Sequence, residues 1–173
     1  VRLLSEAEAI FEELKLPKRQ FTCIKNIGWA WENAGDYERA LEQYQQALEL
    51  ARRIPYAKGE GVALSYIGII HLQQNRYEQA LECMQGALRI QEREQDRDLI
   101  PNTQNYIGSI HLQLGNYDKA LDYYQRSLAS YEKAGDPPNM AIALVNIGIV
   151  YERTKRPREA REVYQQALDI SRQ

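Results

Sequence analysis

The chain repeats itself with a period of 40 residues. Four glycines are spaced by this interval, each preceded by isoleucine, and an alanine follows each glycine after twelve residues. These positions are Gly28, Gly68, Gly108 and Gly148, with Ala40, Ala80, Ala120 and Ala160. Such a period indicates copies of one supersecondary unit, and each copy buries its apolar face only against its neighbours. A chain of this kind is expected to fold as a stack of repeats.

Each copy contains two helical patterns. In the second copy, apolar residues recur at intervals of three and four from Leu64 to Leu72, and again from Tyr77 to Leu88. This spacing is typical of amphipathic helices. No stretch of the chain alternates with period two, so the sequence predicts an all-α fold without a sheet.

Turn residues separate the predicted helices. Gly35-Asp36 and Gly115-Asn116 each provide a glycine for the left-handed position after a helix and a side chain that can cap the next helix. Gly135-Asp136-Pro137 predicts a helix end, an N-cap and a proline in the first turn. Asp98 is the predicted cap of the first helix in the third copy, with Pro101 in its first turn.

The four repeated glycines lie inside predicted helices, where glycine costs about 1 kcal/mol relative to alanine. We interpret them as positions where two antiparallel helices approach each other almost backbone to backbone. The alanines and the small residues seven positions after them are expected to assist the same contact.

Composition excludes several classes of protein. The chain has 173 residues and a net charge of −2, without the basic excess that nucleic-acid binding requires. It has no apolar run long enough to span a membrane. Only two cysteines, Cys23 and Cys83, are present, which favours a reducing compartment and predicts a cytoplasmic protein. We expect neither a nucleic-acid nor a membrane partner.

Known catalytic and cofactor motifs are missing from the sequence. There is no phosphate-binding loop, dinucleotide-binding glycine motif or nucleophile elbow. His71 and His111 occupy equivalent positions in successive copies, which places them about one helix pair apart and favours packing over metal binding. The two cysteines have no neighbouring base in sequence and are interpreted as structural. We predict no enzyme activity, metal or cofactor.

The repeated positions resemble the tetratricopeptide repeat signature. Gly28, Ala40 and Ala47 with their equivalents match its small residues, and Tyr44, Tyr124 and Tyr164 match its aromatic position. The 40-residue unit is similar to the longer class of these repeats, found in bacterial multi-repeat signalling and scaffold proteins and, more distantly, in kinesin light chains and spindle-orienting G-protein regulators. The resemblance implies a right-handed α-solenoid of antiparallel helix pairs.

The repeats predict one array over the whole chain. Residues 1–20 contain the second helix of a preceding, truncated repeat; residues 21–60, 61–100 and 101–140 are full repeats; residues 141–173 are a truncated last repeat. We expect the chain to be a fragment of a longer protein. The last repeat departs from the pattern, with Arg161 at a leucine position and Pro157 at a tyrosine position.

In the family that the chain resembles, partner segments usually lie on the concave face formed by the first helix of each repeat. By that resemblance, the predicted peptide-binding residues are Lys25, Asn26, Trp29, Ser65, Tyr66, Ile69, Gln73, Asn102, Asn105, Tyr106, Ser109, Gln113, Asn146, Ile149 and Arg153. Asparagine and glutamine can bond a peptide backbone, whereas tyrosine and tryptophan are typical interface anchors.

The predicted function is therefore a non-catalytic scaffold that binds a peptide segment of a protein partner. The alternative is a regulatory array that binds a signalling peptide, or its own effector domain, and controls an attached enzyme or DNA-binding domain. The terminal helix lacks a cap, which leaves self-association possible.

Overall fold

The computed structural model describes residues 1–172, and over these residues the chain forms nine α-helices and no β-strand. The helices are α1 (Arg2–Glu13), α2 (Pro17–Asn33), α3 (Tyr37–Arg53), α4 (Ala57–Gln73), α5 (Tyr77–Arg93), α6 (Ile100–Gln113), α7 (Tyr117–Ala134), α8 (Pro137–Arg153) and α9 (Pro157–Ser171). The all-α repeat fold predicted from the 40-residue period is confirmed.

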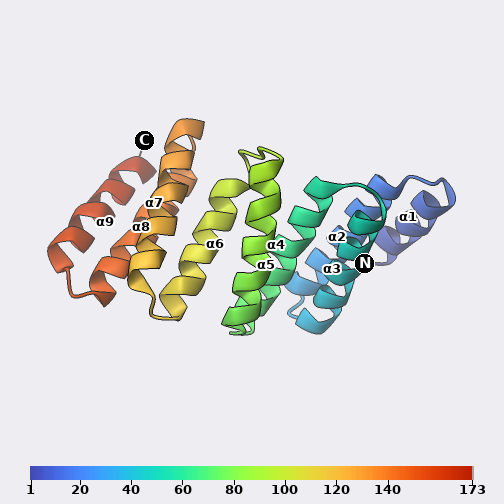
Figure 1. The fold of residues 1–173 in the computed structure, drawn as a ribbon, viewed down its shortest axis with the longest axis horizontal. Coiled ribbons are helices and arrows are strands. Elements are labelled where there is room, and N and C mark those ends of the chain that lie inside the picture. Colours follow the sequence, from blue (N-terminus) through green and yellow to red (C-terminus); the bar gives the residue numbers. More distant parts are fainter. Residues whose placement is uncertain (173) are drawn as a thin grey trace. The chain divides into compact units, whose positions relative to one another are not determined.

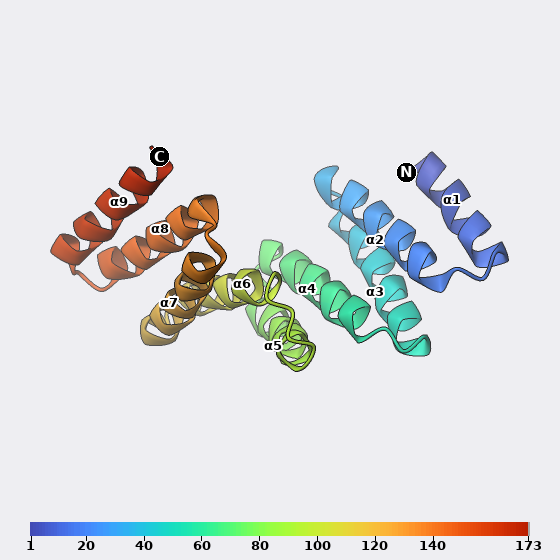
Figure 2. The ribbon, with the colours of Figure 1, turned by 90° about the horizontal axis from the view of Figure 1, so that it is seen from above.

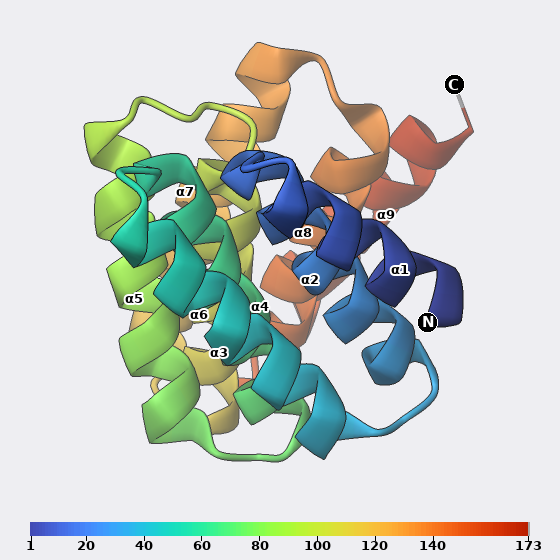
Figure 3. The same cartoon turned by 90° about the vertical axis from the view of Figure 1, so that its right-hand side faces the viewer.

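The chain divides into two compact units. Unit 1 covers Val1–Gln95 and contains α1 to α5, whereas unit 2 begins at Asp96 and contains α6 to α9. In unit 1, α2 pairs with α3 and α4 pairs with α5, and α3 also packs on α4 (Figure 1). Figure 3 views this unit from the end that carries α1. In unit 2, α6 pairs with α7 and α8 with α9, and α7 packs on α8 (Figure 2). The single array over residues 1–173 stays a prediction.

The first helix of three copies begins four residues before the predicted repeat start, at Pro17, Ala57 and Pro137. The first helix of the third copy is shorter and begins at Ile100. The reason is Pro101, which has no N–H to donate and is therefore confined to the first turn of a helix. The chain before it forms a turn instead of an additional helical turn.

Most of the predicted turn chemistry is confirmed. Gly35 and Gly115 have φ of 77° and 72°, and Gly135 ends α7 in the left-handed conformation. Asp36 caps α3 by accepting a hydrogen bond from the backbone N–H of Arg39 at 3.1 Å. Asp136 caps α8 in the same way.

Two predicted caps differ in detail. Asn116 stands at the N-cap of α7, but its side chain makes no capping hydrogen bond. Asp98 does not cap α6: Leu99 holds the N-cap position, and the Oδ1 atom of Asp96 accepts from the N–H of Leu99 at 3.4 Å. Because Pro101 delays the start of α6, Asp96 is the carboxylate that reaches the turn before the helix.

The repeated glycines accommodate side chains, which corrects the predicted backbone-to-backbone contact. A Cβ atom added at Gly108 would lie 2.8 Å from the ring of Tyr124, and one at Gly28 would lie 2.6 Å from the ring of Tyr44. The two tyrosines are fully buried. Gly28, Gly108 and Gly148 therefore leave room for a tyrosine ring from the second helix of their own pair. Gly68 instead faces the Met84 side chain, with the backbone oxygen of Ala80 at 3.4 Å from the added Cβ. The four repeated alanines are buried as predicted.

Candidate functional site

The inner face is our name for the surface of the first helices that carries the predicted peptide-binding residues. In unit 1 it is held by a hydrogen-bond network around Glu32 of α2. The hydroxyl of Tyr44 donates to Oε2 of Glu32 at 2.7 Å, and Nε2 of Gln73 donates to Oε1 at 3.1 Å. Burial and the bond to Glu32 raise the pKa of Tyr44. The network fixes Gln73, a predicted site residue on α4, against α2.

Tyr66 and Lys25 adjoin this network. The ring of Tyr66 stacks on Tyr44 with centroids 4.9 Å apart, and the Nζ atom of Lys25 lies 5.6 Å from the centroid of the Tyr66 ring. Burial and the nearby Glu32 raise the pKa of Tyr66. Unit 1 thus brings together Lys25, Tyr66 and Gln73, as the sequence predicted for side chains on one face.

Trp29 is the large side chain that the inner face of unit 1 leaves open. It is 56% exposed, although an indole of this size is normally covered in a folded protein. Asn26, Tyr66 and Ile69 are half-buried. An exposed tryptophan beside half-buried polar and aliphatic groups is typical of a surface that binds another molecule.

In unit 2 the inner face contains a pair of amides. Nδ2 of Asn146, on α8, donates a hydrogen bond to Oδ1 of Asn105, on α6, at 3.0 Å. Among the described residues, no further hydrogen bond is made by Nδ2 of Asn105 or Oδ1 of Asn146. The pair therefore keeps donor hydrogens on one residue and an acceptor oxygen on the other.

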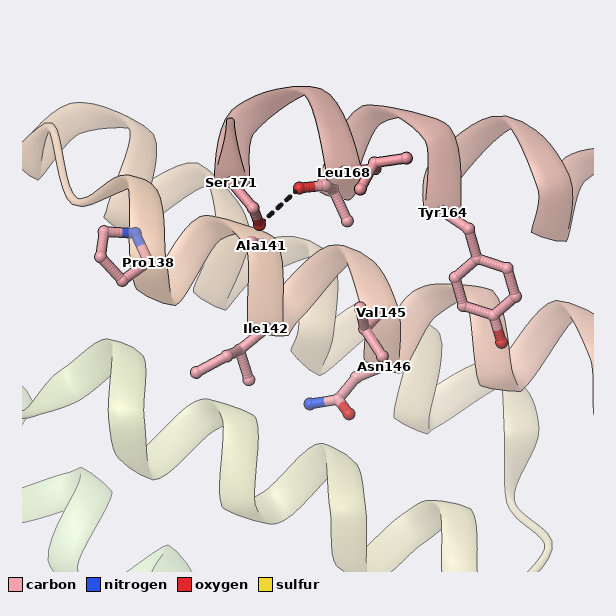
Figure 4. A pocket seen from close by; sticks show the side chains of 9 residues that line it. Pro138, Ala141, Ile142, Val145, Asn146, Tyr164, Leu168 and Ser171 are labelled. Atoms are coloured by element: carbon pink, nitrogen blue, oxygen red, sulfur yellow. Dashed lines mark hydrogen bonds between the residues drawn. The ribbon is translucent and has the colours of Figure 1, made fainter. Parts of the chain in front are cut away.

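A hollow of about 650 Å³ opens between α8 and α9 next to this pair (Figure 4). Its lining consists of Pro138, Ala141, Ile142, Val145, Asn146, Tyr164, Ala167, Leu168 and Ser171. Ile142, Val145 and Leu168 are 51%, 41% and 43% exposed. The hydroxyl of Ser171 donates to the carbonyl of Ala167, so the hollow is lined mainly by apolar groups.

The prediction from sequence missed two of the aromatic and aliphatic residues in this lining, Tyr164 and Leu168. Both lie on α9, whereas the prediction considered first helices alone. The sequence contained a sign that α9 packs less completely. Pro157 and Arg161 stand where the other second helices carry a tyrosine and a leucine, side chains that extend the packing surface of those helices.

Some predicted residues already form hydrogen bonds with other groups of the chain. Oδ1 of Asn102 accepts from the hydroxyl of Tyr131 at 2.6 Å. The hydroxyls of Ser65 and Ser109 donate to carbonyls of their own helices and also accept hydrogen bonds from second helices. The remaining predicted residues, Tyr106, Gln113, Ile149 and Arg153, are half-buried or exposed on α6 and α8.

The two histidines are packed into the helix pairs. His111 is buried and stacks on Tyr123 with ring centroids 5.7 Å apart, and its Nδ1 atom has no hydrogen-bond partner among the described residues. Over residues 1–172, no group of three or more His, Cys, Asp or Glu side chains could hold a metal ion. None of the helices in that range is long and apolar enough to cross a membrane.

Burial predicts a pH dependence of stability. Desolvation, together with Lys119 for His111 and Arg76 for His71, lowers the pKa of both imidazoles. As pH falls, the imidazoles of the unfolded chain therefore bind protons at a higher pH than those of the folded chain. Stability is lost as pH falls below the ordinary histidine pKa of about 6.5. We expect His71→Phe/His111→Phe to show a smaller drop in melting temperature between pH 7.5 and pH 5 than the unsubstituted chain.

The measurement is thermal unfolding followed by circular dichroism across this pH range. The control is His111→Phe alone, which should remove part of the drop. An unchanged pH slope in the double variant would show that the imidazoles do not control this dependence.

The comparisons with solved structures show the same fold in other proteins. BtubC from P. vanneervenii is 18% identical, with 97% of this chain and 73% of that chain covered and a TM-score of 0.84. The apo form of RapI is 17% identical, with 98% and 74% covered and a TM-score of 0.77. A kinesin-light-chain-like repeat protein of Podosopora anserina is 15% identical, with 98% and 84% covered and a TM-score of 0.75.

No curated protein matches the chain in sequence. The family model of the tetratricopeptide repeat matches residues 31–93, 59–133 and 99–173, which together cover most of the chain. The matched ranges contain Gly68, Gly108 and Gly148, which face side chains of their partner helices, and the four buried alanines. The chain belongs to the tetratricopeptide repeat family.

Proposed function

We propose that this chain is a non-catalytic protein-interaction module that binds an extended peptide segment on the inner face of unit 2. The observation that carries the proposal is the Asn105–Asn146 pair, which adjoins the 650 Å³ hollow. Membership of a family that generally mediates protein–protein interactions supports it.

The amide pair suits a peptide backbone. The free Nδ2 hydrogens of Asn105 can donate to a carbonyl of the segment, and Oδ1 of Asn146 can accept from a backbone N–H. Neither bond depends on the partner's side chains. The bond between the two asparagines fixes both amides in advance, which reduces the entropy lost on binding.

The hollow suits apolar side chains of the same segment. Asn146 lines the hollow and also belongs to the amide pair, so the backbone contacts and the side-chain contact share one residue. Ile142, Val145 and Leu168 provide apolar surface that water covers in the free protein (Figure 4). Burial of this surface would supply affinity at about 25 cal/mol per Å².

The test is a peptide-display selection, followed by fluorescence anisotropy on the selected peptides. We expect Asn105→Ala/Asn146→Ala to weaken binding by tenfold or more, because the backbone of the peptide loses two hydrogen bonds. Val145→Gln, which makes the hollow polar, should weaken binding of peptides that carry a large apolar residue.

The matched control is Asp122→Ala/Gln125→Ala, which changes two exposed residues on α7. It should leave affinity unchanged. Failure to enrich any peptide on the folded chain, or equal affinity for the amide-pair variant and the control, would contradict the proposal.

A further inference from the structure

A second hollow lies in unit 1, away from the inner face. It has a volume of about 550 Å³ and lies among α3, α4 and α5. Leu64 and Ile90 provide apolar surface, and Cys83 and Gly86 complete that part of the lining. The charged groups around it are Arg52, Glu60, Glu82, Arg89 and Arg93. None of these residues belongs to the predicted peptide-binding set.

Gly86 is unusual for its place in the repeat. It lies in the interior of α5, where the equivalent residues of the other copies are Gln46, Arg126 and Gln166. Glycine at such a position costs about 1 kcal/mol relative to alanine. Packing does not require it, since an added Cβ would lie 3.4 Å from Cδ1 of Leu64, an ordinary contact. The missing side chain leaves the hollow open.

The charges around the hollow are unevenly paired. The Nε atom of Arg52 contacts Oε1 of Glu60 at 2.9 Å, and Arg93 contacts Glu94 at 3.4 Å. Neither Arg89 nor Glu82 forms an ion pair within the part of the chain that the structure describes, and three arginines against two glutamates leave the lining with a net positive charge. The Nη2 atom of Arg89 lies 3.8 Å from the Cβ position of Gly86, so the guanidinium extends over the glycine.

We propose that this hollow docks an acidic partner segment in which an aliphatic side chain neighbours a carboxylate. The aliphatic group would pack on Leu64 and Ile90 in the space that Gly86 leaves. The carboxylate would accept two parallel hydrogen bonds from the guanidinium of Arg89, a geometry that arginine favours. This surface is independent of the amide pair in unit 2, so each site can fail without the other.

The probes are two pools of fluorescent heptapeptides with leucine at the centre. The flanking positions are Asp or Glu in the acidic pool and Lys or Arg in the basic pool. We expect the acidic pool to bind at least tenfold more tightly than the basic pool. Gly86→Gln, which introduces the residue of two other copies, and Arg89→Ala should each reduce acidic-pool binding by fivefold or more.

Folding of the variants is checked by circular dichroism, and Gly86→Gln should melt at or above the temperature of the unsubstituted chain. All binding measurements use the Asn105→Ala/Asn146→Ala background, so that only this hollow is read, and Asp122→Ala/Gln125→Ala in that background is the matched control that should bind the acidic pool normally. Equal binding of the two pools, or full binding by both Gly86→Gln and Arg89→Ala, would overturn the proposal.

Cys83 reports where the peptides bind. Because Cys83 lines the hollow whereas Cys23 is buried, alkylation by iodoacetamide should occur mainly at Cys83. A saturating acidic pool should slow this alkylation threefold or more. If the pool binds without slowing it, the peptides occupy another surface and the assignment to this hollow is wrong.

Discussion

Gly108→Ala is expected to lower the free energy of unfolding by about 1–3 kcal/mol, although alanine is the better helix former. The added methyl group would lie 2.8 Å from the ring of Tyr124. That ring is fully buried and its hydroxyl is bonded to Ser109 at 3.0 Å, so it cannot move aside freely. The measurement is urea unfolding followed by circular dichroism.

Gly68→Ala is the matched control, because the same repeat position faces a different side chain. The added Cβ would lie 3.0 Å from the nearest atom of Met84, whose unbranched side chain can adopt another rotamer. We expect its stability to remain within about 1 kcal/mol of the unsubstituted chain. Equal losses in Gly68→Ala and Gly108→Ala would show that the ring contact does not explain the glycine.

Tyr124→Ala is expected to have the largest effect on stability, about 3–5 kcal/mol. The ring lies in the core cluster of unit 2 with Ala120, Ile147 and Val150. Its removal leaves a cavity beside Gly108, which has no side chain to fill it, and removes the hydrogen bond that Ser109 accepts. Tyr124→Phe keeps the ring and should lose only about 1 kcal/mol.

Tyr164→Ala provides the comparison at the same repeat position. Tyr164 is only half-buried and lines the open hollow between α8 and α9, so water can occupy the space that its ring leaves. We expect a loss less than half that of Tyr124→Ala in the same urea measurement. A loss as large as that of Tyr124→Ala would show that the loss in free energy of unfolding does not depend on how completely neighbouring side chains enclose the ring.

The helix pairs could be predicted from sequence because their determinants are local. Apolar spacing of three and four residues specifies each helix from within. The glycines at positive φ and the caps at Asp36 and Asp136 lie within a few residues of the helix ends that they specify. The start of α6 was harder to place. There Pro101 restricts the helix, and a carboxylate five residues before it, Asp96, bonds the turn.

The role of the repeated glycines could not be resolved from spacing alone. A glycine at a helix contact admits either a close backbone or a ring from the opposite helix, and the sequence does not distinguish these. The acceptors of the tyrosine hydroxyls do not provide a consistent signal. Glu32 accepts from Tyr44, but the equivalent residue of the third copy is Leu112, and the hydroxyl of Tyr124 bonds Ser109 instead.

The candidate site could be predicted only as a face. The repeat positions placed Asn105 and Asn146 correctly on α6 and α8, but their mutual bond depends on the packing of one helix pair on the next. Packing within one pair, of α7 on α6, engages Asn102 with Tyr131. Whether an amide is available to a partner is therefore set by tertiary contacts within and between helix pairs, which the repeat pattern does not encode.

The most direct test of peptide binding by unit 2 is an NMR titration with a peptide from the display selection. The account predicts that the side-chain amide signal of Asn105 and the methyl signals of Ile142 and Val145 shift together and saturate at one affinity. Shifts confined to exposed residues of α7, such as Asp122 and Gln125, with the Asn105 amide and the two methyl groups unmoved, would contradict it.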